Sequence, residues 1–269
     1  MKYQSSKKTL EDEDQSSKST KIQIHWRDLI PFFPQLKKSK LQSIQMTKEC
    51  LYSSTHIIHS EYMKDIIKQF YPEENHHQLI VTDATSCIGG TFMAMVKPFG
   101  KINAVEINPI HSEIMYNNIQ TIFGDLSKKV TIINDNYLSV WDAIKSNIII
   151  IDPPWGGLDY TKKTSLKLYL DDKKGNPIEL MDIVNMVLSK TEIVMVRVPY
   201  NYDMKRTEDV ACKFSKKFRF IKKNPKRKAK TSYFIYVFSN ILPEKDLSHI
   251  DENNYISHVS YRKISYVEL

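Results

Sequence analysis

The residues most able to do chemistry follow an apolar run, Asn147-Ile-Ile-Ile-Ile-Asp152-Pro153-Pro154-Trp155. The two prolines stiffen the loop and remove backbone N–H donors, so that carbonyl and carboxylate acceptors face a ligand. An acceptor pair of this kind orients an exocyclic amine, whose lone pair is delocalised into its ring. Trp155 adds a flat face for stacking on a base. The spacing predicts catalysis by Asp152, Pro153, Pro154 and Trp155, without a nucleophilic side chain.

A second set of polar residues and glycines predicts a nucleotide-like cofactor. Its predicted members are Asp83, Ala84, Thr85, Gly89, Gly90, Glu106, Asp135 or Asn136, and Asp152. Asp83 and Glu106 each end an apolar segment, and a carboxylate at the second position binds a ribose diol in nucleotide-binding folds. The glycine spacing matches neither a dinucleotide fingerprint nor a phosphate-binding loop. The set instead suits S-adenosylmethionine, with either Asp135 or Asn136 near the adenine.

Regular alternation of strands and helices positions these residues. Strands are expected over 78–84, 101–107, 129–134, 147–152 and 191–199, and helices over 56–71, 89–99, 109–123, 137–144 and 178–188. A hairpin follows, with strands at 218–223 and 232–238. This βα rhythm predicts an α/β, Rossmann-like, mostly parallel seven-stranded sheet with an antiparallel C-terminal hairpin. Ligands of such sheets bind at the carboxyl ends of the strands.

Composition limits the class of protein. Residues 1–21 are polar and predict a disordered tail, followed by an aromatic and helical N-terminal extension over 22–75, a catalytic domain over 76–240 and a C-terminal extension over 241–269. There is no signal peptide and no membrane-spanning run, so we expect an intracellular monomer in nucleus or cytoplasm. The three cysteines show no disulfide framework or zinc spacing, and no metal is expected.

Positive charge points to an acidic partner. The net charge is +8, and residues 222–230 carry six Lys or Arg in nine positions. Lys226 and Arg227 in this run are candidates for phosphate or RNA contact. A nuclear-localisation signal and a solvated hairpin turn remain alternatives.

Four motifs together resemble the trimethylguanosine synthase family of RNA cap guanine-N2 methyltransferases: "DATSCIGG", "AVEINP", "IIDPPWGGLDY" and "RVPYNYD". The resemblance covers roughly residues 50–240. It implies a class I methyltransferase fold, S-adenosylmethionine as methyl donor, and a 7-methylguanosine RNA cap methylated on N2. It also implies that Trp155 stacks on the methylated guanine, where a cation–π contribution favours the charged base, and that Asn201 and Thr55 contribute to substrate binding.

The sequence departs from the family pattern in two places. Cys87 or Ser86 stands where the family usually has glycine, and Tyr200 stands where it has arginine. The number of methyl groups transferred stays open, one or two. Two alternatives remain: an adenine-N6 methyltransferase of RNA or DNA, which shares the Asp-Pro-Pro-Trp logic, and a non-catalytic module that binds caps or RNA.

Overall fold

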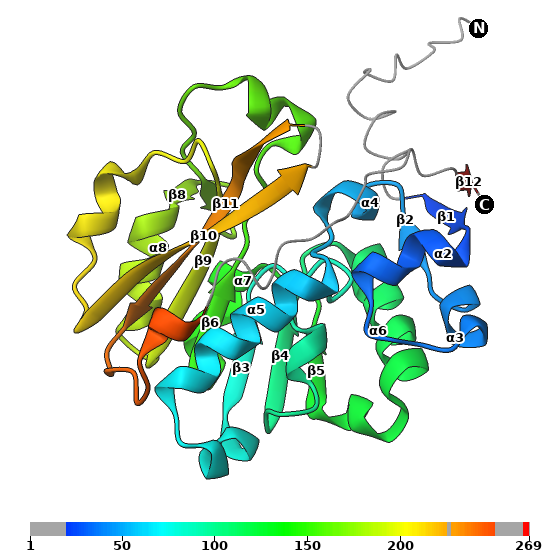
Figure 1. Cartoon of the computed structure of the whole chain (residues 1–269), viewed down its shortest axis with the longest axis horizontal. Helices are drawn as coiled ribbons and strands as arrows, with labels where there is room; N and C mark the ends of the chain where they lie inside the picture. The colour runs from blue at the N-terminus through cyan, green and yellow to red at the C-terminus, as the bar shows by residue number, and fades with distance from the viewer. Residues whose placement is uncertain (1–19, 225–226, 251–265, 269) are drawn as a thin grey trace, which may run out of the picture.

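The computed structural model describes residues 20–224, 227–250 and 266–268 (Figure 1). Its central feature is a seven-stranded sheet in the order β10-β11-β9-β6-β3-β4-β5. The strands are β3 (Ile80–Asp83), β4 (Lys101–Val105), β5 (Val130–Ile133), β6 (Ile148–Ile151), β9 (Ile193–Pro199), β10 (Phe214–Asn224) and β11 (Arg227–Ser239). Strands β5, β4, β3, β6 and β9 run parallel, whereas β11 pairs antiparallel with both β9 and β10. The predicted Rossmann-like sheet with its antiparallel hairpin is confirmed.

The apolar run before Asp152 forms the central strand β6. Ile148 and Ile150 pack into one core, and Ile149 and Ile151 pack into a second core on the opposite face of the sheet. All four isoleucines are buried, as expected for a parallel strand covered on both faces. The strand therefore occupies the middle of a three-layer structure, and the loop that follows it starts from a rigid position.

Helices cover both faces of the sheet. α5 (Ile57–Ile67) and α6 (Pro109–Phe123) contribute to the first core, while α7 (Tyr137–Val140) and α8 (Leu180–Leu188) contribute to the second (Figure 1). α6 begins where the Asn108 side chain accepts a hydrogen bond from the Ile110 N–H at 2.9 Å, and Pro109 occupies the first turn. α8 begins with a similar contact from Glu179 to the Met181 N–H.

The helix predicted over 89–99 is wrong. That segment contains a 3₁₀ turn at Met93–Met95. Ser60 of α5 donates its hydroxyl to the Thr91 carbonyl at 2.6 Å and accepts from the Ala94 N–H at 3.0 Å. The hydroxyl therefore occupies backbone groups that a regular α-helix needs.

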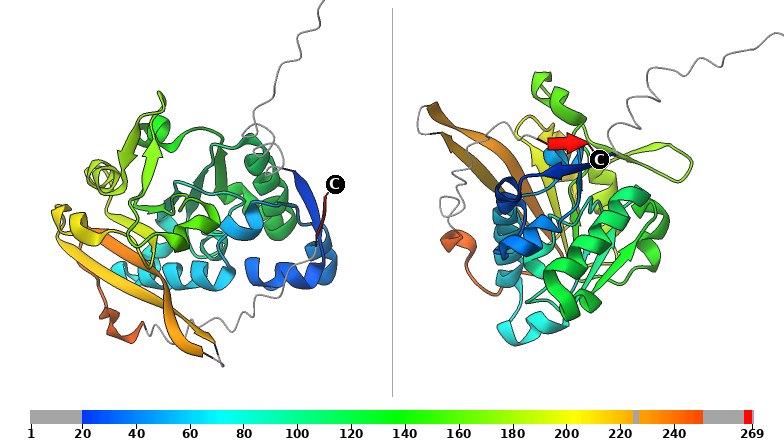
Figure 2. Two further views of the ribbon diagram at one scale, coloured as in Figure 1. Left: turned by 90° about the horizontal axis from the view of Figure 1, so that it is seen from above. Right: turned by 90° about the vertical axis from the view of Figure 1, so that its right-hand side faces the viewer.

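The N-terminal region packs against α6 rather than forming a separate long helix. It comprises β1 (Lys21–Ile24), α2 (Trp26–Leu29), α3 (Lys38–Gln42), β2 (Met46–Thr47) and α4 (Cys50–Ser53). β12 (Tyr266–Glu268) pairs with β1, which also pairs with β2 (Figure 2). Lys21 belongs to β1, and residues 1–19 of the predicted tail lie outside the described residues. Parts of the chain far apart in sequence thus meet beside α6.

Two further features lie outside the main sheet. β7 (Tyr169–Asp171) and β8 (Pro177–Glu179) form a small hairpin, and β10 and β11 project to one side of the molecule (Figure 2). Most of the basic run belongs to β10 and β11 rather than to a turn; Lys226 and the Arg227 side chain lie outside the described part of the chain. No helix in the described part is long and apolar enough to cross a membrane.

Candidate active site

Carboxylates gather at the carboxyl edge of the parallel strands. Asp83 ends β3, where it pairs in register with Ala104 of β4 and Ile150 of β6. Glu106 and Asp152 follow those two neighbouring strands. The topology therefore brings together three acids that are far apart in the sequence, as predicted from the strand ends.

The loop after β3 is joined directly to the loop after β6. The Ala84 N–H donates to the Ile150 carbonyl at 2.9 Å. The Thr85 hydroxyl donates to the Asp152 carbonyl at 2.9 Å and accepts from the Asp152 N–H at 3.0 Å. The first residues of the predicted cofactor loop thus fix the backbone of the predicted catalytic loop.

Asp83 presents a buried acceptor. Its Oδ1 accepts from the Thr85 N–H at 3.2 Å, whereas its Oδ2 has no hydrogen-bond partner among the described residues. Burial raises the pKa of Asp83 to about 8, and the nearby charges of Asp152 and Glu106 act in the same direction. A buried carboxylate oxygen without a partner is costly, and a cationic amine is a suitable partner for it.

Glu106 is held by two backbone donors. Its Oε2 accepts from the Cys87 N–H at 2.7 Å and its Oε1 from the Asn108 N–H at 2.8 Å. Burial raises its pKa, and these two hydrogen bonds oppose that effect. Each carboxylate oxygen has a further lone pair with which to accept a hydroxyl hydrogen, so a fixed Glu106 suits a ribose diol.

The structure distinguishes Asp135 from Asn136. The Asn136 Oδ1 accepts from the Leu138 N–H at 2.9 Å at the start of α7, and its Nδ2 donates to the Asp171 carbonyl at 2.8 Å. Asp135 is exposed, and its Oδ1 accepts from the Asn136 N–H. Because the Asn136 amide already has structural partners, Asp135 is the better placed of the two for a ligand.

Thr55 reaches the site from the segment before α5. A Cβ on Gly90 would lie 2.5 Å from the Thr55 carbonyl oxygen, so glycine allows the two backbones to approach. The Thr55 hydroxyl lies 3.5 Å from Asp152 Oδ2 and accepts from Arg197 Nη1 at 3.1 Å. Gly90 therefore has a packing role, and its predicted contact with the cofactor stays a prediction.

An ion pair between Asp152 and Arg197 was not predicted. Arg197 Nη1 lies 2.5 Å from Asp152 Oδ2, and the two side chains are only 14% and 10% exposed. Burial raises the pKa of Asp152, although Arg197 and Thr55 oppose this effect. One signal in the sequence marks Arg197: it is a charged residue within the apolar strand "IVMVRVP".

Aromatic rings surround the Arg197 guanidinium. Its central carbon lies 5.0 Å from the Trp155 ring centroid and 4.5 Å from that of Tyr233, which β11 places opposite Pro199 of β9. Trp155 is half-buried and meets Tyr160 edge-on at 5.2 Å. Tyr233 is a second residue that the sequence pattern alone did not single out.

The loop that carries Trp155 contains a glycine turn and is held at its end by hydrogen bonds from Asn201. Pro153 is buried and Pro154 exposed; Gly156 and Gly157 then have φ values of 90° and 67°, which favour glycine. Asn201 Nδ2 donates to the carbonyls of Tyr160 and Lys163, both at 2.8 Å. Asn201 thus holds the end of this loop, while its Oδ1 lacks a partner among the described residues.

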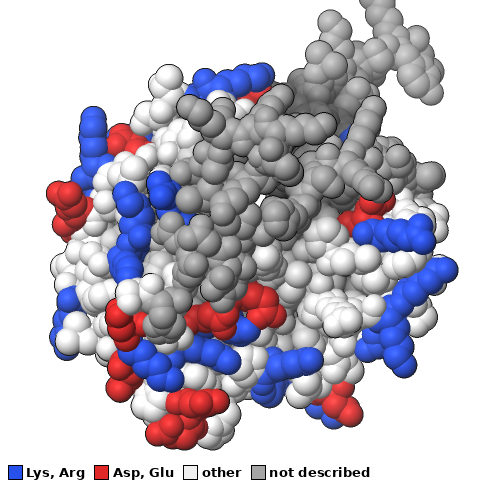
Figure 3. Space-filling model, viewed as in Figure 1, with Lys and Arg blue, Asp and Glu red and all other residues white. Residues whose placement is uncertain are grey.

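Where Figure 3 shows described residues, the charged side chains do not form one continuous basic surface. Lys and Arg side chains there are interspersed with Asp and Glu. The predicted contact of Lys226 and Arg227 with phosphate stays a prediction.

Comparison with known proteins gives the family. Residues 78–259 match the model of the RNA cap guanine-N2 methyltransferase family, which is more than half of the chain. The chain belongs to this family. Its fold is that of class I methyltransferases, and its cofactor is S-adenosylmethionine.

Individual relatives are distant. An uncharacterized protein of Acanthamoeba polyphaga mimivirus is 30% identical over 135 residues, which cover 49% of this chain and 50% of that protein. The trimethylguanosine synthase of Schizosaccharomyces pombe is 27% identical over 110 residues, 39% of this chain and 43% of that enzyme. The matches therefore span half the length of these curated relatives or less.

Solved structures agree on the fold alone. A candidate methyltransferase from Porphyromonas gingivalis W83 has a TM-score of 0.51 at 14% identity, covering 81% of this chain and 49% of that one. An S-adenosylmethionine-dependent methyltransferase from Agrobacterium tumefaciens has a TM-score of 0.50 at 10% identity, and the match covers 68% of this chain and 62% of that one.

The residues at the strand edge fit the cofactor. The unpartnered Asp83 Oδ2 suits its cationic amino group, and the fixed carboxylate of Glu106 suits its ribose. Asp135 is exposed and follows β5, the strand next to β4, and its predicted contact with the adenine stays a prediction.

Proposed function

We propose that this protein transfers methyl groups to the exocyclic N2 of a 7-methylguanosine RNA cap. One observation carries the proposal: Asp152 and Trp155 occupy the loop after the central strand β6, next to the cofactor carboxylate Asp83. An acceptor for an amine and a platform for a base thus lie beside the place that the cofactor residues define. The family to which the chain belongs supports guanine N2 as the acceptor.

Asp152 performs the central task in this proposal. When bound, S-adenosylmethionine supplies an electrophilic methyl group on its sulfonium sulfur. Arg197 and Thr55 contact Asp152 Oδ2, so we assign Oδ1 to the hydrogen of the guanine amine. This contact would orient the nitrogen lone pair toward the methyl carbon. As the N–C bond forms, the S–C bond would break to leave S-adenosylhomocysteine, and Asp152 would accept the N–H proton.

The environment of Asp152 suits both parts of that task. Burial raises its pKa, which makes the carboxylate a better proton acceptor, while Arg197 keeps it ionised. The Thr85 hydroxyl fixes the Asp152 backbone by bonding to both its N–H and its carbonyl. The protein therefore contributes positioning and local electrostatics rather than a covalent intermediate.

Trp155 provides selection for the methylated base. A 7-methylguanine ring is positively charged, so stacking on tryptophan gains a cation–π contribution that plain guanine lacks. Arg197 already lies near this ring, but its charge is paired with Asp152. The pair lowers the repulsion that a free arginine would exert on a cationic base. Asn201 holds the same loop by hydrogen bonds to the carbonyls of Tyr160 and Lys163.

The test is methyl transfer from labelled S-adenosylmethionine to 7-methylguanosine diphosphate, with guanosine diphosphate as the matched acceptor. Mass analysis of the product distinguishes one methyl from two. We expect transfer to the methylated nucleotide alone. Transfer to internal adenines of an uncapped RNA, with none to the cap nucleotide, would assign the protein to adenine-N6 chemistry. Cofactor binding without transfer to either acceptor would assign it to binding only.

A further inference from the structure

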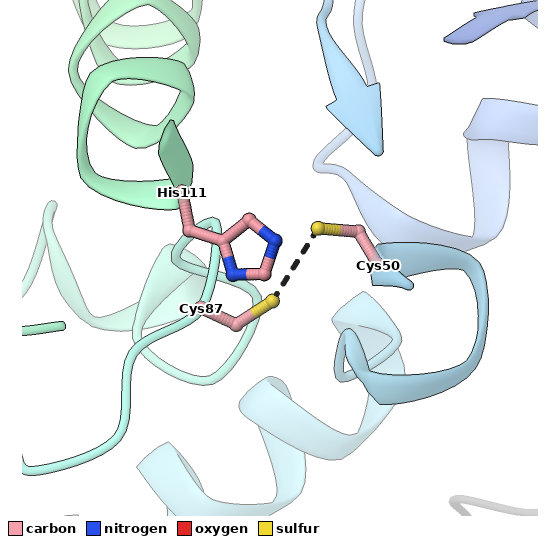
Figure 4. Close-up of side chains that lie close together, drawn as sticks. All are labelled: Cys50, Cys87 and His111. Atoms are coloured by element: carbon pink, nitrogen blue, oxygen red, sulfur yellow. Dashed lines mark hydrogen bonds between the residues drawn. The ribbon is translucent and has the colours of Figure 1, made fainter. Parts of the chain in front are cut away.

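Two cysteine thiols and one histidine imidazole lie close together at the loop that follows β3. They are Cys50 at the start of α4, Cys87 in the loop after β3, and His111 in the first turn of α6 (Figure 4). One ligand atom from each lies within 4.8 Å of the other two, and the two sulfur atoms are 3.5 Å apart. Figure 4 shows the three side chains pointing toward one another from different segments of the chain.

The sulfur–sulfur distance is close to that between two ligands of one metal ion, and the three ligand atoms, all within 4.8 Å of one another, need only a small approach to share an ion. Zn–S bonds are about 2.3 Å and Zn–N bonds about 2.0–2.1 Å, so tetrahedral geometry places ligand atoms roughly 3.5–3.8 Å apart. Two Zn–S bonds place their sulfur atoms about 3.8 Å apart, and the observed sulfur–sulfur distance of 3.5 Å is slightly shorter than this value. A disulfide would use only the two cysteines and would leave the adjacent imidazole without a part in the cluster.

We propose that Cys50, Cys87 and His111 bind a zinc ion that connects the N-terminal region to the cofactor loop. Two thiolates and one imidazole are a common donor set for zinc. Cys50 and His111 are buried, with exposures of 0% and 5%, so the bound ion is structural rather than open to substrate. A fourth donor is close by, because Glu49 Oε2 lies 3.8 Å from His111 Nε2.

Groups around the three ligands are those that orient metal ligands in proteins. The other ring nitrogen of His111, Nδ1, lies 3.9 Å from Glu106 Oε1, which is beyond hydrogen-bond distance, so the carboxylate acts on the imidazole through its charge. The Thr47 hydroxyl lies 3.0 Å from Cys50 Sγ and 3.1 Å from His111 Nε2, the nitrogen that would bind the ion, so zinc would replace the Thr47 contact with Nε2. The Ser53 hydroxyl lies 3.5 Å from Cys87 Sγ.

The site shares residues with the cofactor edge. Cys87 donates its N–H to Glu106, and it is the non-glycine residue with positive φ, 50°, in the part of the chain that the structure describes. Such a backbone conformation persists where surrounding contacts hold it. A metal–sulfur bond to Cys87 would hold this loop and, through it, the position of the Glu106 carboxylate. Loss of the metal should therefore weaken cofactor binding without removing any cofactor contact.

The first experiment measures metal in the purified full-length protein by mass spectrometry of the elements, and then titrates chelator-treated protein with cobalt(II). Cobalt bound to thiolates gives charge-transfer absorption that cobalt bound to oxygen and nitrogen alone does not. We expect about one zinc per chain, and one equivalent of cobalt with a two-thiolate spectrum. Binding should release protons, because both thiols must ionise.

Variants locate the site. Cys50→Ser and His111→Gln should lose zinc and lower the melting temperature by several degrees, as expected for loss of a ligand that binds only the folded state. Cys212→Ser, which removes the third cysteine from a different core, is the matched control and should keep its zinc and the wild-type melting temperature. A chelator should lower the melting temperature and the affinity for S-adenosylhomocysteine in the wild type and in Cys212→Ser, but not in Cys50→Ser.

A second measurement needs no variant. Zinc should slow the alkylation of Cys87, which is partly exposed, relative to chelator-treated protein, while the reaction of the partly exposed Cys212 is unchanged; peptide mass analysis identifies the modified cysteines. The proposal is overturned if folded wild-type protein binds neither zinc nor cobalt through sulfur, or if zinc does not slow the alkylation of Cys87. A Cys50–Cys87 disulfide in a protein that binds no metal would also overturn it. None of these results bears on the acceptor of methyl transfer.

Discussion

Arg197 in β9 and Asp152 after β6 form an almost buried ion pair, with Nη1 2.5 Å from Oδ2. The rings of Trp155 and Tyr233 lie against the same guanidinium. Two parallel strands therefore contribute opposite charges to one point at the edge of the sheet. This pair connects the carboxylate that we propose as catalytic to the aromatic platform that we assign to the cap.

Removal of Arg197 should destabilise the protein, because the Asp152 carboxylate would stay buried without its partner. Arg197→Met leaves Asp152 unpaired, and we expect the free energy of unfolding to fall by about 3 kcal/mol or more. The double variant Arg197→Met, Asp152→Asn should lose clearly less than the sum of the two single variants, because it buries no unpaired charge. Chemical denaturation of all four proteins measures this. Additive losses would mean that the pair is not energetically coupled.

Trp155→Ala should remove the base platform and spare the cofactor site. We expect affinity for 7-methylguanosine diphosphate to fall about tenfold or more, since stacking contributes roughly 1–3 kcal/mol per base. Methyl transfer should be nearly abolished, and the dissociation constant of S-adenosylhomocysteine should be unchanged. Trp141→Ala is the control, because Trp141 is likewise half-buried but lies in the 3₁₀ turn after α7. Unchanged turnover in Trp155→Ala contradicts the stacking role.

Asp83 should make cofactor binding dependent on pH. Its pKa of about 8 in the free protein means that the carboxyl is largely protonated below that pH. A cationic amine favours the ionised form, so binding releases this proton, and affinity should rise from about pH 6 toward pH 8 and then level off. By the same linkage, the stability contributed by protonated Asp83 decreases as pH rises toward 8, since its pKa is raised by folding.

Calorimetry with S-adenosylhomocysteine in buffers of different ionisation enthalpy counts the released protons. Asp83→Asn should weaken binding and remove the part of the release that belongs to this group. The neighbouring carboxyls of Asp152 and Glu106 remain in the variant, so the difference between the two proteins isolates Asp83. Equal proton release in both proteins is the outcome that rules out Asp83 as the partner of the amine.

Asn201→Asp should loosen the Trp155 loop with little change in side-chain size. The substitution replaces an amide that donates to the Tyr160 and Lys163 carbonyls with a carboxylate that repels them. We expect a loss of about 1–3 kcal/mol in the free energy of unfolding and a higher KM for the acceptor. Cofactor affinity should be unchanged.

Asn185→Asp is the matched control, because the Asn185 contact with the Ala211 N–H uses an oxygen that aspartate keeps. If Asn201→Asp raised the KM of the cofactor and the acceptor equally, the residue would act on the fold as a whole rather than on this loop.

Much of the sheet was predictable because parallel strands buried on both faces need continuous apolar residues, as in Ile148–Ile151. The same pattern placed Asp83, Glu106 and Asp152 at strand ends, and the order of strands then brought them to one edge. The 3₁₀ turn in place of the helix over 89–99 was not predictable, because contacts from Ser60, a residue distant in sequence, decide the path of that backbone.

Local apolar pattern and backbone restriction were enough to place the strands, the acids that end them and the Pro-Pro-Trp-Gly-Gly loop. The partners of the polar groups were settled only by long-range packing. Arg197 pairs with Asp152, Asn136 donates to the Asp171 carbonyl, and Cys50 meets Cys87 and His111. Such contacts join residues tens of positions apart in the chain, and only the packing of the strands, loops and helices that carry them fixes their distances and their burial.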